Sequence, residues 1–134
     1  MEVPDRWLYE YCIVRYLPQA ERGEFVNIGL LMMCKRQKWM KGRIFLNIEK
    51  IRSLHPDVDI DNLRLQASLF EKTDVPRKDL PVEEKYRWLS AEKSASIRVS
   101  PSHPAIVDKE SIVNQDSETA LLREFDRLFA ELVE

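Results

Sequence analysis

The chain has 134 residues, of which 44% are apolar and 33% charged, and its net charge is −2. These are values of a globular protein, and a chain of this length buries roughly two thirds of its unfolded surface without a disulfide or metal. With only 3 Gly and 7 Pro, a low-complexity linker is excluded, and we expect a single domain over residues 1–134.

Neither export nor membrane insertion is expected. Residues 1–6 lack the basic start and apolar run of a signal peptide, and no segment approaches the ~18 consecutive apolar residues of a membrane span. We therefore expect a cytoplasmic protein with no membrane partner. Cys12 and Cys34 would be reduced thiols that act as small buried hydrophobic residues. Because neither cysteine has a nearby Cys or His partner, we expect no zinc site. We also expect no other metal and no cofactor.

Charge is distributed unevenly along the chain. Residues 1–52 carry 10 Lys and Arg against 6 Asp and Glu, a net charge of +4, whereas residues 53–134 have a net charge of −6. An anionic partner is therefore expected to contact the N-terminal half.

Two apolar segments predict a hairpin at the centre of a sheet. Residues 8–17 are rich in aromatic and β-branched side chains on both alternating faces, as in a strand that is covered on both sides. Residues 25–34 form the most apolar segment. A regular strand there would place four side chains on one face: Val26, Ile28, Leu30 and Met32. Pro18 ends the first strand, and Gly23 suits a turn that needs a positive φ.

The remaining pattern predicts further strands and helices. A polar turn at residues 35–38 leads into a third strand over residues 39–46. Residues 96–100 alternate as a half-buried strand, and the prolines that follow prevent a helix, so an extended loop is expected up to residue 115. Apolar spacing predicts four helical segments: residues 48–54, 60–72, 82–89 and 121–133. Asp116 or Ser117 is expected to cap the last of these.

These elements predict an α+β fold. Its sheet should be mostly antiparallel and built on the central N-terminal hairpin, because short connections favour pairing between neighbouring strands. The apolar helix stripes are expected to pack mainly on one face of that sheet.

Polar residues gather near the first turn and form the strongest candidate site. Arg15, Arg22, Glu24 and Asn27 would supply two guanidinium groups, a carboxylate and an amide. One interpretation is structural: Arg15 and Glu24 form a buried ion pair, and Asn27 satisfies backbone groups in the turn. In this interpretation Arg22 is the residue that contacts a partner. The alternative is a small enzyme or phosphate-binding protein, with Arg15 and Arg22 holding the anion and Glu24 acting as acid and base.

Other candidate motifs are weaker. The chain has no Gly-rich phosphate loop, nucleophile elbow or spaced His pair, and its two histidines, His55 and His103, are isolated, so catalysis is not the favoured interpretation. Five basic residues between positions 35 and 43, with Trp39 among them, could contact nucleic acid, but a solvated hairpin turn explains them as well. Three aspartates at positions 57, 59 and 61 do not form a calcium loop. That loop needs Gly and Glu where this chain has Asn62 and Ser68.

Two runs around the first turn resemble a known family. Residues 14–18 contain an Arg-Tyr-x-Pro step, and residues 22–29 read Arg-Gly-Glu-x-Val-Asn-x-Gly. Together they resemble the bacterial family catalogued as domain of unknown function 3037. The resemblance implies no established activity, but members of that family are often encoded beside HipA-like serine/threonine kinases. It therefore implies a non-enzymatic binding or regulatory module that acts with a partner protein, and a HipA-like kinase is the partner it suggests.

Overall fold

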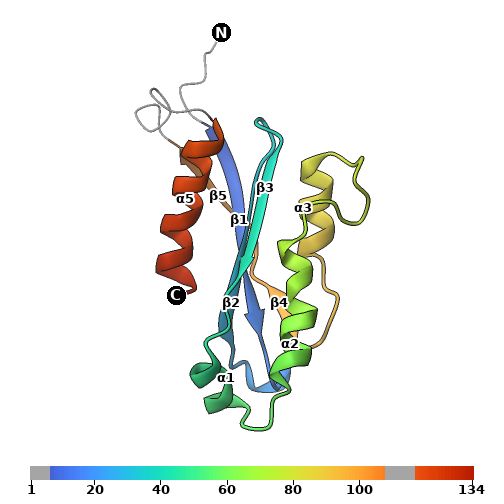
Figure 1. The fold of residues 1–134 in the computed structure, drawn as a ribbon, viewed down its shortest axis with the longest axis vertical. Helices are drawn as coiled ribbons and strands as arrows, with labels where there is room; N and C mark the ends of the chain where they lie inside the picture. The colour runs from blue at the N-terminus through green and yellow to red at the C-terminus, as the bar shows by residue number, and fades with distance from the viewer. Residues whose placement is uncertain (1–6, 108–116) are drawn as a thin grey trace.

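The structure is a computed structural model that describes residues 7–107 and 117–134. Five strands form one antiparallel sheet with helices on both faces (Figure 1). The strands are β1 (Trp7–Tyr16), β2 (Val26–Cys34), β3 (Trp39–Ile44), β4 (Ile97–Val99) and β5 (His103–Val107). The α-helices are α1 (Ile48–Leu54), α2 (Ile60–Ala67), α3 (Val82–Ser90) and α5 (Ser117–Leu132). Two 3₁₀ helices, η1 (Ala20–Arg22) and η2 (Ser68–Glu71), precede β2 and follow α2. The predicted α+β class and the β1–β2 hairpin are confirmed.

β1 is paired along both of its edges. The strand order is β3-β2-β1-β4, and β5 pairs with β1 on the same edge as β4. β4 pairs with the end of β1, from Val14 to Tyr16, and β5 pairs with its beginning, from Trp7 to Tyr11. The predicted extended loop after residue 100 is therefore wrong at residues 103–107. Proline excludes a helix, but a strand at the edge of a sheet tolerates it.

Ser100 fills the gap between β4 and β5. Its backbone N–H donates to the carbonyl oxygen of Ile13 at 2.9 Å, and its hydroxyl oxygen accepts from the Ile13 N–H at 2.9 Å. The hydroxyl also donates to the Pro101 carbonyl oxygen. Ser100 is buried, so these bonds keep the backbone of β1 satisfied where the ladder of strand hydrogen bonds is interrupted.

β2 contains a bulge that changes which residues share a face. Val14 pairs with Gly29, but Arg15 pairs with Asn27, so Ile28 is an extra residue on β2. Four β2 side chains lie in one core cluster, Val26, Ile28, Leu31 and Met33, and three lie in the other, Leu30, Met32 and Cys34. The predicted regular alternation of Val26, Ile28, Leu30 and Met32 is therefore wrong, because the bulge reverses the alternation.

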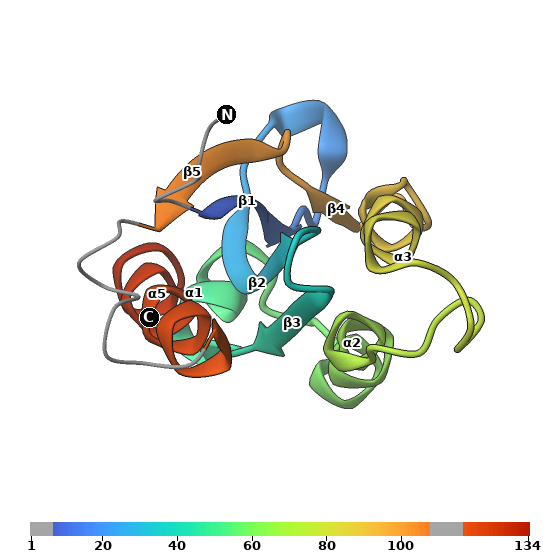
Figure 2. The same cartoon turned by 90° about the horizontal axis from the view of Figure 1, so that it is seen from above.

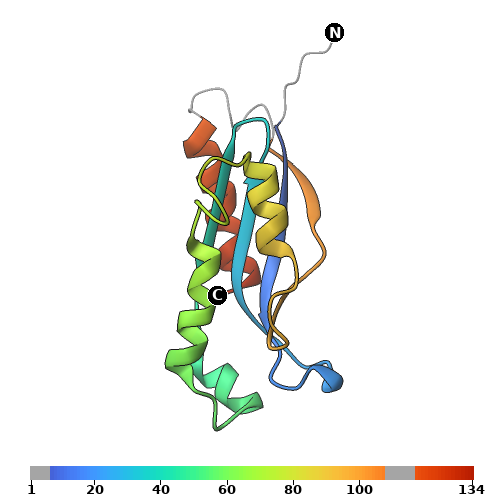
Figure 3. The same ribbon diagram turned by 90° about the vertical axis from the view of Figure 1, so that its right-hand side faces the viewer.

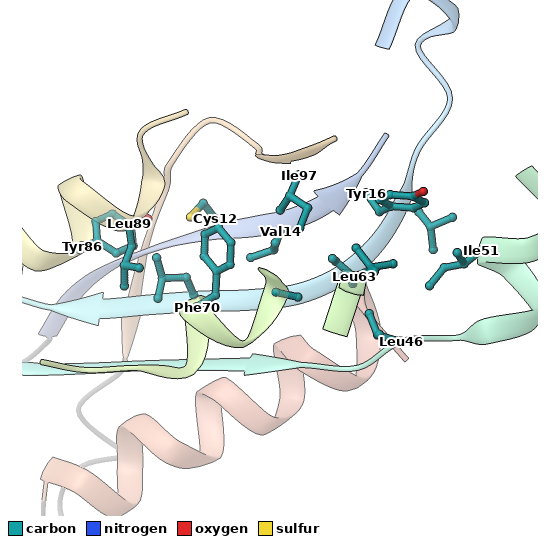
Figure 4. Packing of buried hydrophobic residues seen from close by; sticks show 14 of the residues in the cluster. Cys12, Val14, Tyr16, Leu46, Ile51, Leu63, Phe70, Tyr86, Leu89 and Ile97 are labelled. Carbon is teal, nitrogen blue, oxygen red and sulfur yellow. The ribbon is translucent and has the colours of Figure 1, made fainter. Parts of the chain in front are cut away.

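Each face of the sheet has its own apolar core. On one face, buried side chains of the strands pack against α1, α2, η2 and α3, including Ile51, Leu63, Phe70, Tyr86 and Leu89 (Figure 4). On the other face, α5 lies along the sheet (Figures 2 and 3). It packs there through an apolar stripe. The stripe consists of Ala120, Leu121, Phe125, Leu128 and Phe129, and Val133, directly after the helix, extends it. Three of the described α-helices lie on one face, as predicted; below, the opposite face is called the α5 face. Of the two predicted caps of α5, Asp116 lies outside the described residues, and Ser117 is the first residue of the helix.

Two helices have side-chain caps, and both cysteines are buried, as predicted for the thiols. Asn47 caps α1 and Asp59 caps α2, each by accepting a hydrogen bond from the backbone N–H three residues later. Cys12 and Cys34 are free and buried. Burial raises the pKa of the Cys12 thiol to about 11, so it remains protonated at neutral pH and behaves as an apolar side chain. No helix in the described ranges has the length and apolar character needed to cross a membrane.

A close crossing of η2 over β3 gives a test of this packing. A Cβ atom at Gly42 would overlap the backbone carbonyl group of Phe70, whereas a Cβ at Gly23 would meet no atom within 4 Å. Gly42→Ala should therefore lower the free energy of unfolding by about 3 kcal/mol or more, since backbone atoms must move apart. Gly23→Ala should cost only the ~1–2 kcal/mol of a left-handed conformation. Urea denaturation of both variants measures this difference, and equal costs would contradict the crossing.

Candidate functional site

The β1–β2 connection forms an exposed turn with a defined backbone. The Leu17 N–H donates to the Ser96 carbonyl oxygen at 2.6 Å, which fixes the start of the turn against the residue before β4. The chain then forms η1, and Gly23 adopts a positive φ of 73° before the chain enters β2. The predicted positive φ of Gly23 is confirmed, and it is what reverses the chain here.

Glu24 pairs with Arg22 and not with Arg15. The Arg22 Nε and the Glu24 Oε1 are 2.9 Å apart, and 62% and 49% of these two side chains are exposed. The predicted buried Arg15–Glu24 pair is therefore wrong. Side chains alternate along an extended chain, so Phe25 and Asn27 share the face of Arg15, while Glu24 lies on the opposite face.

Phe25, and not Glu24, is the side chain that contacts Arg15. The Arg15 guanidinium carbon lies 4.3 Å from the centre of the Phe25 ring, a cation–π contact between diagonal neighbours on paired strands. Arg15 is half-buried. Its Nε is buried without a hydrogen-bond partner among the described residues. The guanidinium is thus oriented by packing on an aromatic ring.

Asn27 connects the hairpin to the end of α5. Its Nδ2 donates to the Leu132 carbonyl oxygen at 2.9 Å, and its Oδ1 is buried with no partner in the part of the chain that the structure describes. The prediction that Asn27 satisfies backbone groups in the turn is therefore wrong. The carbonyl groups in the last turn of a helix lack N–H partners within the helix, and the Asn27 amide donates a hydrogen bond to one of them.

Two pockets adjoin this turn, and both include Ser53 and Leu54 of α1 in their walls. The turn pocket, about 180 Å³, is lined in addition by Pro18, Gln19, Arg22 and Glu24. The helix-end pocket, about 430 Å³, lies between the start of β2, α1 and the end of α5, and Phe25 and Asn27 belong to its wall. Of the four predicted site residues, Arg22 and Glu24 line the turn pocket and Asn27 lines the helix-end pocket. Arg15 contributes through its contact with Phe25.

The basic residues of the β2–β3 hairpin are partly neutralised. Lys35 lies 3.9 Å from a Glu83 carboxylate oxygen, and Arg43 lies 3.1 Å from one of Asp126. Arg43 also lies over the rings of Phe125 and Phe129 on α5. Because Lys35 and Arg43 already contact side chains of the protein, the hairpin has fewer basic residues free to bind a nucleic acid than its sequence suggests.

The described residues bring together few groups that could perform catalysis. His55 shares a hydrogen bond of 2.7 Å with the Tyr16 hydroxyl, and burial raises the pKa of Tyr16. His103 lies against the ring of Tyr11, with centroids 5.3 Å apart. Within residues 7–107 and 117–134, no group of three or more His, Cys, Asp or Glu side chains is placed to hold a metal ion. Glu24, the residue considered as an acid and base, makes an ion pair with Arg22.

Three parts of this site were not predicted from the sequence. Phe25 was assigned only to the strand, although an exposed aromatic residue directly after a charged turn is a signal for binding. Ser53 and Leu54 come from α1, and the end of α5 comes from the far end of the chain. Their approach to the turn depends on tertiary packing, which no local pattern reveals.

The fold and the site define a small α+β protein with a candidate binding surface at its central hairpin. The sequence profile of the family described as "Protein of unknown function (DUF3037)" matches residues 11–133, so this protein belongs to that family. No curated protein and no solved structure matches the chain. The resemblance seen in the motifs of the first turn is therefore confirmed.

The exposed Arg22–Glu24 pair predicts a small effect on stability. Glu24→Gln should change the free energy of unfolding by no more than about 1 kcal/mol, because an exposed ion pair contributes little. Asn27→Ala should cost more, about 1–3 kcal/mol, because it removes the hydrogen bond to the Leu132 carbonyl. Thermal and urea denaturation measure both values. A loss of about 3–5 kcal/mol for Glu24→Gln would instead indicate a buried ion pair.

Proposed function

We propose that this protein is a non-enzymatic binding or regulatory module of the bacterial cytoplasm that acts with a partner protein. The observation that supports this most strongly is Phe25. This residue is 43% exposed, its ring lies 4.3 Å from the Arg15 guanidinium carbon, and it forms part of the wall of the helix-end pocket. An exposed aromatic ring beside a pocket and an arginine is the composition of a protein-binding hot spot.

The surroundings of Phe25 suit a surface that docks a protein. Because Arg15 already restrains the ring, binding costs less conformational entropy than ordering a free side chain. The exposed Arg22–Glu24 pair lies beside it and supplies charge at the rim, where charged residues determine specificity and association rate more than affinity. We define the docking surface as Arg15, Arg22, Glu24, Phe25 and Asn27, together with the α1 residues Ser53 and Leu54.

The family resemblance supplies the partner to test first. Members of this family are often encoded beside HipA-like serine/threonine kinases, which supports an accessory role with such a kinase. Gene neighbourhood alone carries no mechanism, so the proposal depends on the docking surface.

Affinity purification from the source organism tests the proposal. The tagged wild-type protein should recover a partner identified by mass spectrometry, with the HipA-like kinase as the first candidate. With the purified partner, Phe25→Ser should weaken binding by about thirtyfold, the loss expected for a hot-spot residue worth about 2 kcal/mol. Arg22→Ala should reduce the association rate and change the free energy of unfolding by no more than about 1 kcal/mol.

Matched controls separate binding from folding. Leu65→Ser and Arg64→Ala change exposed residues of α2 that line neither pocket at the turn, and both variants should bind as the wild type does. Phe25→Ser removes an exposed cation–π contact worth about 0.5–1 kcal/mol, so it should remain folded. Recovery of the wild-type protein without any partner, or normal binding by folded Phe25→Ser, would contradict the proposal.

A further inference from the structure

Arg15 and Arg98 lie directly opposite each other on neighbouring strands. Arg15 of β1 pairs with Arg98 of β4, although 83 positions separate them in the sequence. The pairs on either side, Val14 with Val99 and Tyr16 with Ile97, point into the core under α1, α2 and α3. Side chains alternate along a strand, so both arginines point to the α5 face.

This arrangement leaves positive charge without a matching carboxylate. Like charges directly opposite on paired strands are destabilising. In the described part of the chain Arg15 makes no ion pair, and Arg98 contacts one carboxylate oxygen, that of Glu92, at 3.5 Å. The Glu92 side chain is 66% exposed. Of the two guanidinium groups, only that of Arg98 contacts a carboxylate, and this carboxylate is loosely held.

Both arginines are partly buried. The Nε atoms of Arg15 and Arg98 are buried and have no hydrogen-bond partner among the residues described. Arg15 lies on the ring of Phe25, and 41% of the Arg98 side chain is exposed. With each Nε covered, the terminal Nη groups are the donors that remain for a ligand.

We propose that Arg15 and Arg98 form a binding site for the phosphate group of a phosphate monoester. Cross-strand neighbours have Cβ atoms about 5 Å apart, so both guanidinium groups can reach one tetrahedral anion. A phosphate monoester carries up to two negative charges and three acceptor oxygens, which two guanidinium groups can neutralise together. A carboxylate carries one charge, and Glu92 already supplies one to Arg98.

This site differs from the anion site that the sequence suggested. There, Arg15 and Arg22 were expected to hold the anion, but Arg22 is paired with Glu24 at 2.9 Å. The second arginine comes instead from the C-terminal half, whose net charge is negative. Phosphate binding here goes beyond the proposed docking of a protein and can be measured without any partner.

Titration of the full-length protein with inorganic phosphate, at constant ionic strength and about pH 8 where the dianion predominates, tests the site. The ¹H–¹⁵N NMR signals of the Arg15 and Arg98 Nε groups should shift saturably, and acetate should produce much smaller shifts. Arg98→Gln should weaken phosphate binding by at least about tenfold, as expected for loss of charge-assisted hydrogen bonds. Arg64→Gln, at an exposed position of α2, should leave phosphate binding unchanged.

Glu92→Gln gives a test in the opposite direction. It removes an exposed carboxylate that competes with the ligand for Arg98, so it should tighten phosphate binding by about twofold to fivefold. This variant should fold normally, and it keeps the test decisive if Arg98→Gln does not fold. Absence of saturable shifts, equal shifts with acetate, or weaker phosphate binding by Glu92→Gln would overturn the proposal.

Discussion

The pairing of β1 along both of its edges is the constraint on which the rest of the structure depends. β2 occupies one edge, and β4 and β5 share the other, with Ser100 satisfying the backbone of Ile13 between them. Both faces of β1 are also covered, one by α1, α2, η2 and α3 and the other by α5. A strand enclosed in this way has no free edge for aggregation, and it brings distant segments of the chain together. The candidate site is one such meeting point, where the β1–β2 turn, the start of β2, α1 and the end of α5 approach each other.

The bulge at Ile28 determines which side chains reach that meeting point. Without it, the alternation of β2 would place Val26 and Ile28 on the face of Leu30. With it, Val26 and Ile28 enter the core beneath α1, whereas Phe25 and Asn27 lie on the α5 face. Arg15 then contacts Phe25, and Asn27 contacts the end of α5. Bulges commonly redirect side chains near functional sites, which is consistent with a binding role for this turn.

Local features were predictable from the sequence, and contacts between distant segments were not. The β1–β2 hairpin, the apolar stripe of α5, the Asp59 cap and the positive φ of Gly23 each follow from neighbouring residues. The second edge of β1 could not be assigned, because a three-residue strand at 97–99 has no signal that names its partner. The bulge was missed because apolar residues on both faces of β2 hide a change of alternation. Because the bulge was missed, Glu24 and not Phe25 was expected beside Arg15. Arg98 was not recognised as a neighbour of Arg15 because the partner of its strand could not be assigned.

The register between β1 and β4 is the most direct test of this account, because it places Arg98 beside Arg15. Nuclear Overhauser spectroscopy should show close Hα–Hα contacts between Val14 and Val99 and between Tyr16 and Ile97, the pairs that flank the two arginines. A one-residue slip would turn Arg98 toward the opposite face of the sheet. Contacts shifted by one residue, or no contact between residues 97–99 and β1, would therefore contradict the account.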